Sequence, residues 1–275
     1  MSATALLHAV EEVAQLAAGR ALPYFRGGAR AHAARGLGLE AKADGSPVTI
    51  ADREAERAAR AWIEHRFPAD GVLGEEAGVT RPDARRRWIV DPIDGTKSFV
   101  RGVPLWGTLV AVAEGDWTPG APAPEVIAGA VCCAAAGETV VAARGEGCWW
   151  NGSRCSVSDV NTLASASALI TSERFRNAPA ARRDGWARLA ANVALTRTWG
   201  DAYGYLLVAT GRAEVMADPV LADWDAAAVM VVIEEAGGVF TDWSGARSCW
   251  NQSAVATNAA LARAVRECLR SVERR

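Results

Sequence analysis

Two stretches in the first quarter of the chain carry apolar residues three or four positions apart. The first spans residues 1–22, and Pro23 follows where its pattern stops. The second begins at Ile50 and ends just before Pro68. This spacing places apolar side chains along one face of a helix, and proline cannot continue a helix. Both stretches therefore predict amphipathic helices.

Short runs of β-type residues fill most of the remaining first half. The segments GVLG, RRWIVDPI and GTLVAVAEGDW each predict a strand, and the apolar run of the second ends in Asp91, where we expect that strand to end. Residues 125–152 alternate apolar runs with glycine, which predicts antiparallel strands. Residues 26–47 are rich in glycine, alanine and charge, and predict a loop or hairpin.

The pattern changes at about residue 154 to strands that alternate with helices, and a last helix follows Asn258. Strands alternating with helices are typical of α/β proteins. We therefore expect an α/β fold in two parts. Residues 1–153 would form an α+β half, and residues 154–275 an α/β half.

Charge and cysteine content narrow the classes of function. The 275-residue chain has a formal charge of −2 and a pI near 6.0, which gives no general attraction to nucleic acid or to an anionic membrane. Its longest strongly apolar run, residues 226–233, is too short to span a bilayer. Without an export signal, we expect a cytoplasmic protein whose six cysteines are reduced. No CxxC pair occurs, which argues against a zinc site.

Acidic residues gather at the ends of predicted elements, and each has an ordinary explanation. Thr49 and Asp52 fit a helix capping box. Glu75 and its neighbour fit a solvated loop, and Asp225 fits the first turn of a helix. Asp94 followed by glycine is a common turn. Taken one at a time, these residues leave capping and catalysis both open.

The segment DPIDGT, residues 91–96, is harder to explain as a turn. Pro92 fixes the backbone between two carboxylates, and Gly95 leaves room for a bound anion to approach the main chain. A helix starting at Thr96 would present free N–H groups to a phosphate. Carboxylates and a bound anion repel each other unless cations lie between them. Hard divalent cations such as Mg²⁺ fit oxygen ligands of this kind.

An ordered set of motifs resembles the inositol monophosphatase superfamily. The set comprises SPVTIAD (46–52), GEE (74–76), DPIDGT (91–96), WDAAA (224–228) and EEAGGVFTDWSG, and it covers nearly the whole chain. The resemblance implies a layered αβαβα sandwich with the active site between the two halves. GEE and DPIDGT would lie in the first half and WDAAA in the second.

The resemblance also implies a magnesium-dependent phosphatase with five metal ligands. They are Glu75, Asp91, the carbonyl of Ile93, Asp94 and Asp225. Two ions would bind directly, and Glu75 would face a weaker third ion through water. Thr96 with Asp52 would activate the attacking water, with Glu75 among the catalytic residues. The N–H groups of Gly95 and Thr96 would hold the phosphate, and no phosphoenzyme would form.

The sequence around the motifs points to one branch of the superfamily. Residues 94–111 and 197–219 look most like histidinol-phosphate phosphatases of this fold, which implies hydrolysis of L-histidinol phosphate in histidine biosynthesis. The substrate's amine is cationic, so Asp201 and Asp218 become candidate leaving-group contacts. Asp201 fits a helix N-cap equally well. The alternative activity is that of an inositol-1-monophosphatase or a broad-specificity phosphatase of small molecules.

Two further expectations concern assembly and aromatic residues. Relatives are often dimers, so we expect a homodimer that acts on a small phosphate ester, with no nucleic-acid or membrane partner. Trp106 and Trp199 lie near the motifs in sequence. Core packing is the favoured explanation for them, and stacking on the substrate's imidazole is the alternative.

Overall fold

A computed structural model describes residues 1–26, 38, 40–41, 47–175 and 178–270. Its helices are α1 (Ala3–Ala21), α2 (Ile50–Arg66), α3 (Thr96–Phe99), α4 (Ala180–Ala190), α5 (Asp201–Ala209), α6 (Asp223–Glu235) and α7 (Ala262–Leu269). Short 3₁₀ turns cover Leu22–Tyr24, Ala134–Ala136 and Leu163–Ser165. Most of the predicted loop or hairpin at residues 26–47 lies outside the described residues.

The strands within the described residues form three sheets. A two-stranded ribbon pairs β1 (Glu40–Ala41) with β2 (Pro47–Val48). The large sheet has the order β10-β9-β8-β7-β6-β5-β3-β4, and its strands are β3 (Gly71–Gly74), β4 (Gly78–Thr80), β5 (Arg86–Asp94), β6 (Gly107–Glu114), β7 (Glu125–Cys133), β8 (Glu138–Ala143), β9 (Gly147–Trp150) and β10 (Ser153–Cys155). The small sheet has the order β12-β11-β13-β15-β14, and its strands are β11 (Ser167–Leu169), β12 (Leu195–Arg197), β13 (Val215–Asp218), β14 (Val239–Thr241) and β15 (Ala254–Thr257).

The strand directions match the two sequence patterns found before and after about residue 154. Among the described strands of the large sheet, only β3 and β5 run parallel to each other, and β7, β8 and β9 are antiparallel neighbours as predicted. In the small sheet β11 runs parallel to both β12 and β13, as expected where helices connect the strands.

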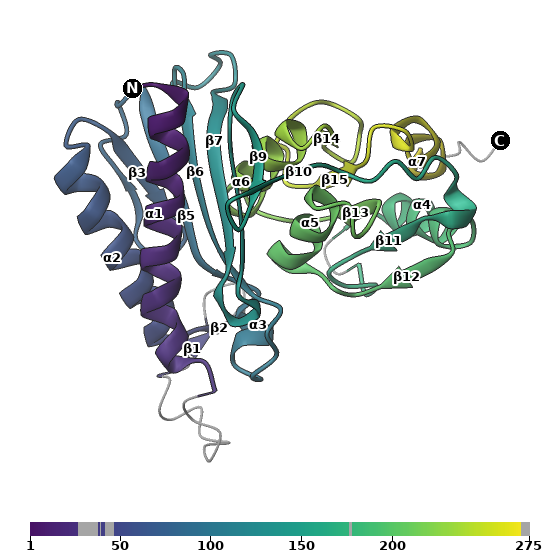
Figure 1. Ribbon diagram of the computed structural model, residues 1–275, viewed down its shortest axis with the longest axis horizontal. Coiled ribbons are helices and arrows are strands. Elements are labelled where there is room, and N and C mark those ends of the chain that lie inside the picture. Colours follow the sequence, from purple (N-terminus) through teal and green to yellow (C-terminus); the bar gives the residue numbers. More distant parts are fainter. Residues whose placement is uncertain (27–37, 39, 42–46, 176–177, 271–275) are drawn as a thin grey trace.

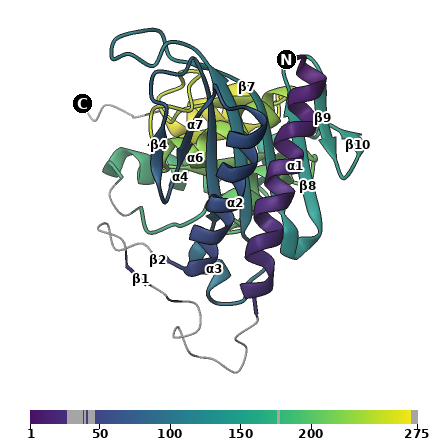
Figure 2. The same ribbon diagram turned by 90° about the vertical axis from the view of Figure 1, so that its left-hand side faces the viewer.

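The elements stack in five layers, as Figures 1 and 2 show. Helices α1 and α2 cover the outer face of the large sheet, α5 and α6 lie between the sheets, and α4 and α7 cover the far face of the small sheet. Alternate residues of one strand serve different layers. On β13, Met216 joins the core around α6, whereas Val215 and Ala217 join the core under α4 and α7. The predicted αβαβα sandwich is confirmed.

Capping explains where the two predicted N-terminal helices begin. The Ser2 hydroxyl accepts a hydrogen bond from the Ala5 N–H at 3.2 Å, and α1 ends at Ala21, two residues before Pro23. Helix α2 begins with the predicted capping box, in which the Thr49 hydroxyl accepts the Ala51 N–H and Asp52 reaches back to the Thr49 N–H. Both helix predictions are confirmed.

The central layer joins the two halves of the chain. Helix α6 comes from the second half, yet its apolar side chains pack against β6 and β7 of the large sheet. Gly129 on β7 permits this approach, because a Cβ there would lie 2.7 Å from Val231 and 2.8 Å from the Ala228 carbonyl oxygen. Strand β10 still pairs in the large sheet. The division at residue 153 stays a prediction.

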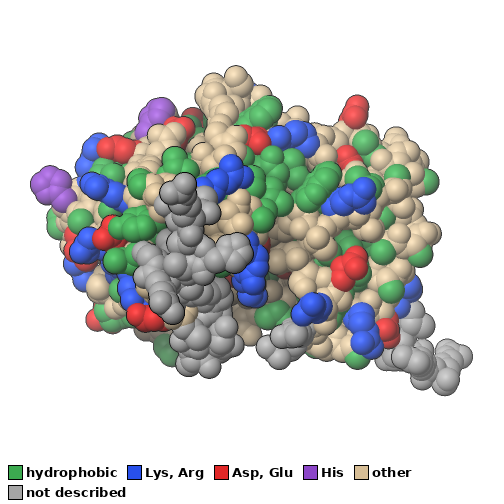
Figure 3. Space-filling view, turned by 90° about the horizontal axis from the view of Figure 1, so that it is seen from below, with side chains coloured by type: hydrophobic (Ala, Val, Ile, Leu, Met, Phe, Trp, Pro, Cys, Tyr) green, Lys and Arg blue, Asp and Glu red, His purple; other side chains and the backbone are tan. Residues whose placement is uncertain are grey.

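The surface carries charges of both signs. Figure 3 views the molecule from below and shows acidic and basic side chains interspersed over the described part of that face. Among the helices of the described residues, none combines the length and the apolarity needed to cross a bilayer.

Candidate active site

Strand β5 carries a bulge in the middle of DPIDGT. It continues past the expected end at Asp91 and runs to Asp94. Asp91 pairs with Leu109 and Asp94 with Gly107, so β5 has one residue more than β6 over this stretch. Pro92 fits a bulge because it has no N–H to offer the ladder, and its carbonyl instead accepts the Thr108 hydroxyl at 2.8 Å.

The bulge brings two carboxylates together. Residues three apart on a regular strand point to opposite faces, and one extra residue reverses that relation. Asp91, Asp94 and Asp225 each present an oxygen atom within 4.8 Å of the others. Asp225 arrives from the first turn of α6, where its other role is to accept the Ala222 N–H at 2.9 Å. Segments more than a hundred residues apart in sequence thus meet at one acidic cluster, here defined as Asp91, Asp94 and Asp225.

Burial and mutual repulsion disfavour charge in this cluster. Burial first, and neighbouring carboxylates second, raise the pKa of Asp91 and of Asp94 well above the ordinary value. Burial is also the main cause that raises the pKa of Asp225 to about 7. Three such carboxylates ionise together only if cations offset their charge. Hard oxygen donors of this kind suit Mg²⁺, Ca²⁺ or Mn²⁺, so the residues fit a divalent metal.

Glu75 lies next to the cluster at the start of the β3–β4 turn. Its backbone N–H donates to the Val90 carbonyl of β5 at 3.2 Å. Its carboxylate hydrogen-bonds with Asp91 and contributes to raising the pKa of Asp91, Asp94 and Asp225. The structure therefore brings all four predicted acidic ligands into one electrostatic unit.

The side chains of Asp52 and Thr96 form hydrogen bonds with different partners. The Oδ2 atom of Asp52 accepts the Thr49 N–H at 2.7 Å and the Thr49 hydroxyl at 2.6 Å. Its Oδ1 atom is buried and has no hydrogen-bond partner among the residues that the structure describes. Burial raises the pKa of Asp52 to about 6, with Glu75 adding to the rise. The Thr96 hydroxyl donates to the Ile93 carbonyl at 3.1 Å, and no bond between Thr96 and Asp52 is found in the described part of the chain.

Gly95 forms the corner between β5 and α3. Its φ of 86° lies in the left-handed region that favours glycine. A Cβ there would lie 3.0 Å from Asp201 Oδ2 and 3.0 Å from the Leu105 carbonyl oxygen. The N–H groups of Ser98 and Phe99 donate to the Gly95 carbonyl, as expected for a helix that begins at Thr96. The helix start at Thr96, which the predicted phosphate cradle requires, is present.

Asp201 lies across from Gly95, at the first residue of α5. Gly200 is the N-cap of this helix and makes no side-chain capping bond, so the N-cap explanation for Asp201 is wrong. Asp201 adopts a φ of 52°, which is rare for a residue with a side chain, and its N–H donates to the Thr171 hydroxyl at 2.9 Å. Burial first, and then Asp218 and Asp225, raise its pKa to about 7.

Asp218 ends β13 deeper in the structure. Oδ1 accepts the Thr171 N–H at 3.1 Å, and Oδ2 accepts the Tyr205 hydroxyl at 2.9 Å. The residue is 5% exposed, and burial is the first cause that raises its pKa. Its negative charge in turn raises the pKa of Asp201.

The two tryptophans near the motifs differ in environment. Trp106 is fully buried and packs edge-on against Phe99 with ring centroids 4.9 Å apart. The core explanation for Trp106 is therefore confirmed. Trp199 is 42% exposed, and the Arg197 guanidinium lies over its ring.

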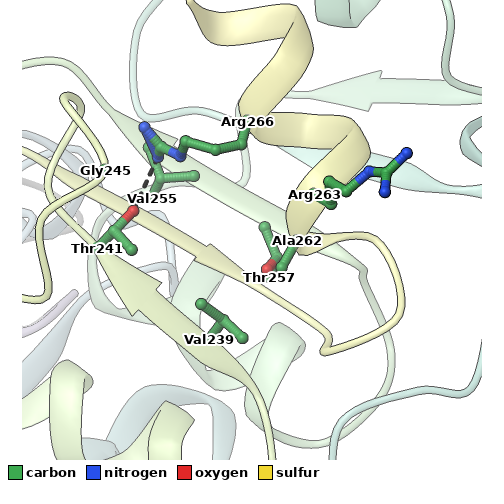
Figure 4. A pocket seen from close by; sticks show the side chains of 8 residues that line it. All are labelled: Val239, Thr241, Gly245, Val255, Thr257, Ala262, Arg263 and Arg266. Carbon is green, nitrogen blue, oxygen red and sulfur yellow. Dashed lines mark hydrogen bonds between the residues drawn. The ribbon is translucent and has the colours of Figure 1, made fainter.

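A separate cavity of about 240 Å³ lies between β14, β15 and α7 (Figure 4). It is lined by Val239, Thr241, Gly245, Val255, Thr257, Ala262, Arg263 and Arg266. None of the predicted site residues lines it. Arg266 is already engaged there, since it donates to the Thr241 hydroxyl and to the Trp243 carbonyl, both at 2.8 Å.

Comparison with known proteins adds to this geometry. The model of the inositol monophosphatase family matches residues 6–273. The chain belongs to this family. A solved structure of the extragenic suppressor protein suhB from Bartonella henselae superposes with a TM-score of 0.84 at 25% identity, covering 97% of this chain and 98% of that one.

Two curated relatives of this family member carry a more specific name. A histidinol-phosphatase of Chlorobaculum parvum is 38% identical over 92% of both chains. A histidinol-phosphatase of Mycobacterium tuberculosis is 40% identical over 82% of this chain and 85% of its own length.

Three residues that support the site of this family member did not emerge from the sequence. Thr171 and Tyr205 hold Asp201 and Asp218 through contacts that join distant segments, and no local pattern marks them. Glu56 contacts the turn that carries Glu75. It did leave a signal, because it follows Asp52 by one helical turn beside the apolar stripe of α2.

Proposed function

We propose that this phosphatase hydrolyses L-histidinol phosphate to L-histidinol and phosphate in a Mg²⁺-dependent reaction. The observation that carries the choice of substrate is Asp201. This partly buried carboxylate faces the proposed phosphate-binding corner at Gly95 and has no metal-ligand role in the proposal. The names of the two relatives point to the same substrate.

The proposed metal site uses the acidic cluster together with Glu75 and the Ile93 carbonyl. Four carboxylates carry about four negative charges, which two Mg²⁺ ions balance, and a third ion facing Glu75 would make the site attractive to a phosphate dianion. When bound, the ions would lower the pKa of a water molecule and neutralise charge that develops on the leaving oxygen.

Asp52 and Thr96 would handle the proton of the attacking water. Within the described part of the chain, the buried Oδ1 of Asp52 has no hydrogen-bond partner, and it is the atom that would accept the proton. Thr49 holds the other oxygen in place, so the carboxylate is already oriented. Thr96 carries the hydroxyl group of the DPIDGT motif and would link the water to Asp52. No cysteine, serine or histidine nucleophile is required, and no phosphoenzyme forms.

The phosphate would lie against the N–H groups of Gly95 and Thr96. The left-handed φ of Gly95 turns the chain from β5 into α3, and the first N–H groups of a helix have no partner within it. These groups orient an anion at a fixed distance from the acidic cluster.

The ammonium group of histidinol would lie against Asp201. The pKa of Asp201 is about 7, so a nearby ammonium group would favour its ionised form. The resulting ion pair would include charge-assisted hydrogen bonds at a partly buried carboxylate. Asp218 would act as the second leaving-group contact. Because both its oxygens already accept hydrogen bonds, its main contribution would be negative charge behind Asp201.

Parallel kinetics on two esters test the substrate. Wild-type protein should show a much higher kcat/KM on L-histidinol phosphate than on inositol 1-phosphate. Asp201→Asn should remove roughly 1.5–3 kcal/mol of binding to the amine, a ~10–100-fold loss on histidinol phosphate alone. The exposed Asp159→Asn serves as the matched control. Activity confined to the inositol ester would instead favour the inositol-1-monophosphatase alternative.

A cytoplasmic homodimer is part of the same proposal. The dimer is proposed because relatives are often dimers. Size-exclusion chromatography with light scattering measures the molar mass and so tests it. A monomeric mass at working concentration would remove the dimer from the account.

A further inference from the structure

Helix α2 contains a buried ion pair that points at the turn carrying Glu75. Glu56 is 1% exposed and Arg60 is 9% exposed, and the Arg60 Nε–H donates to Glu56 Oε1 at 2.7 Å. Burying charged groups is costly unless they are paired and their remaining atoms find hydrogen bonds. The other contacts of this pair therefore indicate what it does.

Glu56 holds the first side of the β3–β4 turn. Its Oε2 atom accepts the Glu76 N–H at 2.7 Å, and its Oε1 atom accepts the Ala77 N–H at 3.0 Å. These are the two residues that follow Glu75. A Cβ at Gly74 would lie only 2.2–2.7 Å from the Glu56 carboxylate, so the glycine before Glu75 leaves the space that the carboxylate fills.

Arg60 holds the second side of the same turn. Its guanidinium donates to the Gly78 carbonyl and contacts the Thr80 hydroxyl at 3.5 Å. The Glu75 N–H is separately tied to the Val90 carbonyl of β5. The backbone is therefore fixed on both sides of Glu75, by β5 before the turn and by α2 after it.

We propose that Glu56 and Arg60 are positioning residues that fix the β3–β4 turn so that Glu75 faces the acidic cluster. The inference rests on the proposed metal role of Glu75. The N–H groups of the turn donate charge-assisted hydrogen bonds to Glu56 instead of to water. Without these bonds, the turn could shift and move the Glu75 carboxylate toward solvent. Residues that orient a metal ligand typically change metal affinity by about 10–100-fold when they are replaced.

Metal binding measured without substrate tests the proposal. Mn²⁺ is the probe, and its dissociation constant is measured by electron paramagnetic resonance on the full chain. Glu56→Gln should raise the dissociation constant of at least one ion by roughly 10–100-fold, because the amide nitrogen cannot accept an N–H. In assays it should raise the Mg²⁺ concentration needed for half-maximal rate, while kcat at saturating Mg²⁺ recovers toward wild type.

Matched variants separate positioning from folding. Glu64→Gln changes an exposed glutamate on the same helix, and its Mn²⁺ affinity should equal that of wild type. Arg60→Lys keeps the charge but loses the forked donor, and it should weaken Mn²⁺ binding in the same direction. It serves as the test if Glu56→Gln does not fold. Folded Glu56→Gln or Arg60→Lys protein with wild-type Mn²⁺ affinity would overturn the inference.

Glu75→Gln distinguishes the two proposals. If it weakens Mn²⁺ binding while folded Glu56→Gln does not, the metal site stands and the positioning pair fails. If wild type binds no Mn²⁺, or Glu75→Gln leaves binding unchanged, the proposed metal role of Glu75 itself fails.

Discussion

The partly buried carboxyl group of Asp225 links the stability of the metal-free protein to pH. Its pKa is about 7 in the folded chain, compared with 3.8 for an ordinary aspartate. The folded protein therefore keeps a proton that the unfolded chain has already lost between these values. Stability from this group is fully present below pH 3.8 and is lost as pH rises through 7.

The size of the effect follows from the difference in pKa. At about 1.4 kcal/mol per pKa unit, the whole shift corresponds to ~4 kcal/mol, of which roughly 2.5 kcal/mol is lost between about pH 5 and pH 8. Asp91 and Asp94 act in the same direction. For a chain of this length, the loss lowers the melting temperature by roughly 5–10 °C.

Urea denaturation in EDTA at pH 5 and pH 8 measures the effect. Asp225→Asn is neutral at both values and can still accept the Ala222 N–H, so its stability should depend less on pH by roughly 2.5 kcal/mol. Saturating Mg²⁺ at pH 8 should raise the free energy of unfolding of the wild type by about 3 kcal/mol, and that of the variant by less. Equal pH dependence of wild type and Asp225→Asn in EDTA would refute the reasoning.

Three further substitutions test separate parts of the site. Gly95→Ala places a methyl group 3.0 Å from two oxygens at a left-handed φ. It should lower the free energy of unfolding, measured by urea denaturation, by about 1–2 kcal/mol and should also lower the turnover rate. Unchanged stability and rate would contradict the role of that corner. Trp106→Ala should destabilise the core by about 3–5 kcal/mol and leave KM unchanged, so a selective rise in KM would favour stacking on the substrate. Asp52→Asn should lower kcat by roughly 10²–10⁴-fold with little change in KM, and wild-type kcat would exclude Asp52 as the proton acceptor.

Local signals predicted the elements well. Pro23 and the Thr49–Asp52 capping box fixed the limits of α1 and α2, because helix ends depend on residues within one turn. The start of α3 after Gly95 was equally local. The fold itself was predicted from the ordered motifs, whose resemblance covered nearly the whole chain.

Long-range geometry was not accessible in the same way. The bulge in β5 depends on how Pro92 and Thr108 meet across two strands. The sequence therefore predicted the strand RRWIVDPI to within one residue of its end, but neither the bulge nor the pairing beyond Asp91. The meeting of Asp91, Asp94 and Asp225 was inferred from family motifs alone, because no spacing rule connects residue 91 to residue 225. The support of Asp218 by Tyr205 likewise depends on tertiary packing.

Phosphate release from L-histidinol phosphate by wild type and by Asp94→Asn, each with Mg²⁺ and with EDTA, tests the central claim most directly. Asp94 is a member of the acidic cluster, and its carboxylate is a metal ligand in our proposal. We predict rapid release by wild type with Mg²⁺, no release in EDTA, and a rate for Asp94→Asn lower by on the order of a hundredfold or more. Undiminished release in EDTA, or from Asp94→Asn, would contradict a phosphatase that works through this cluster.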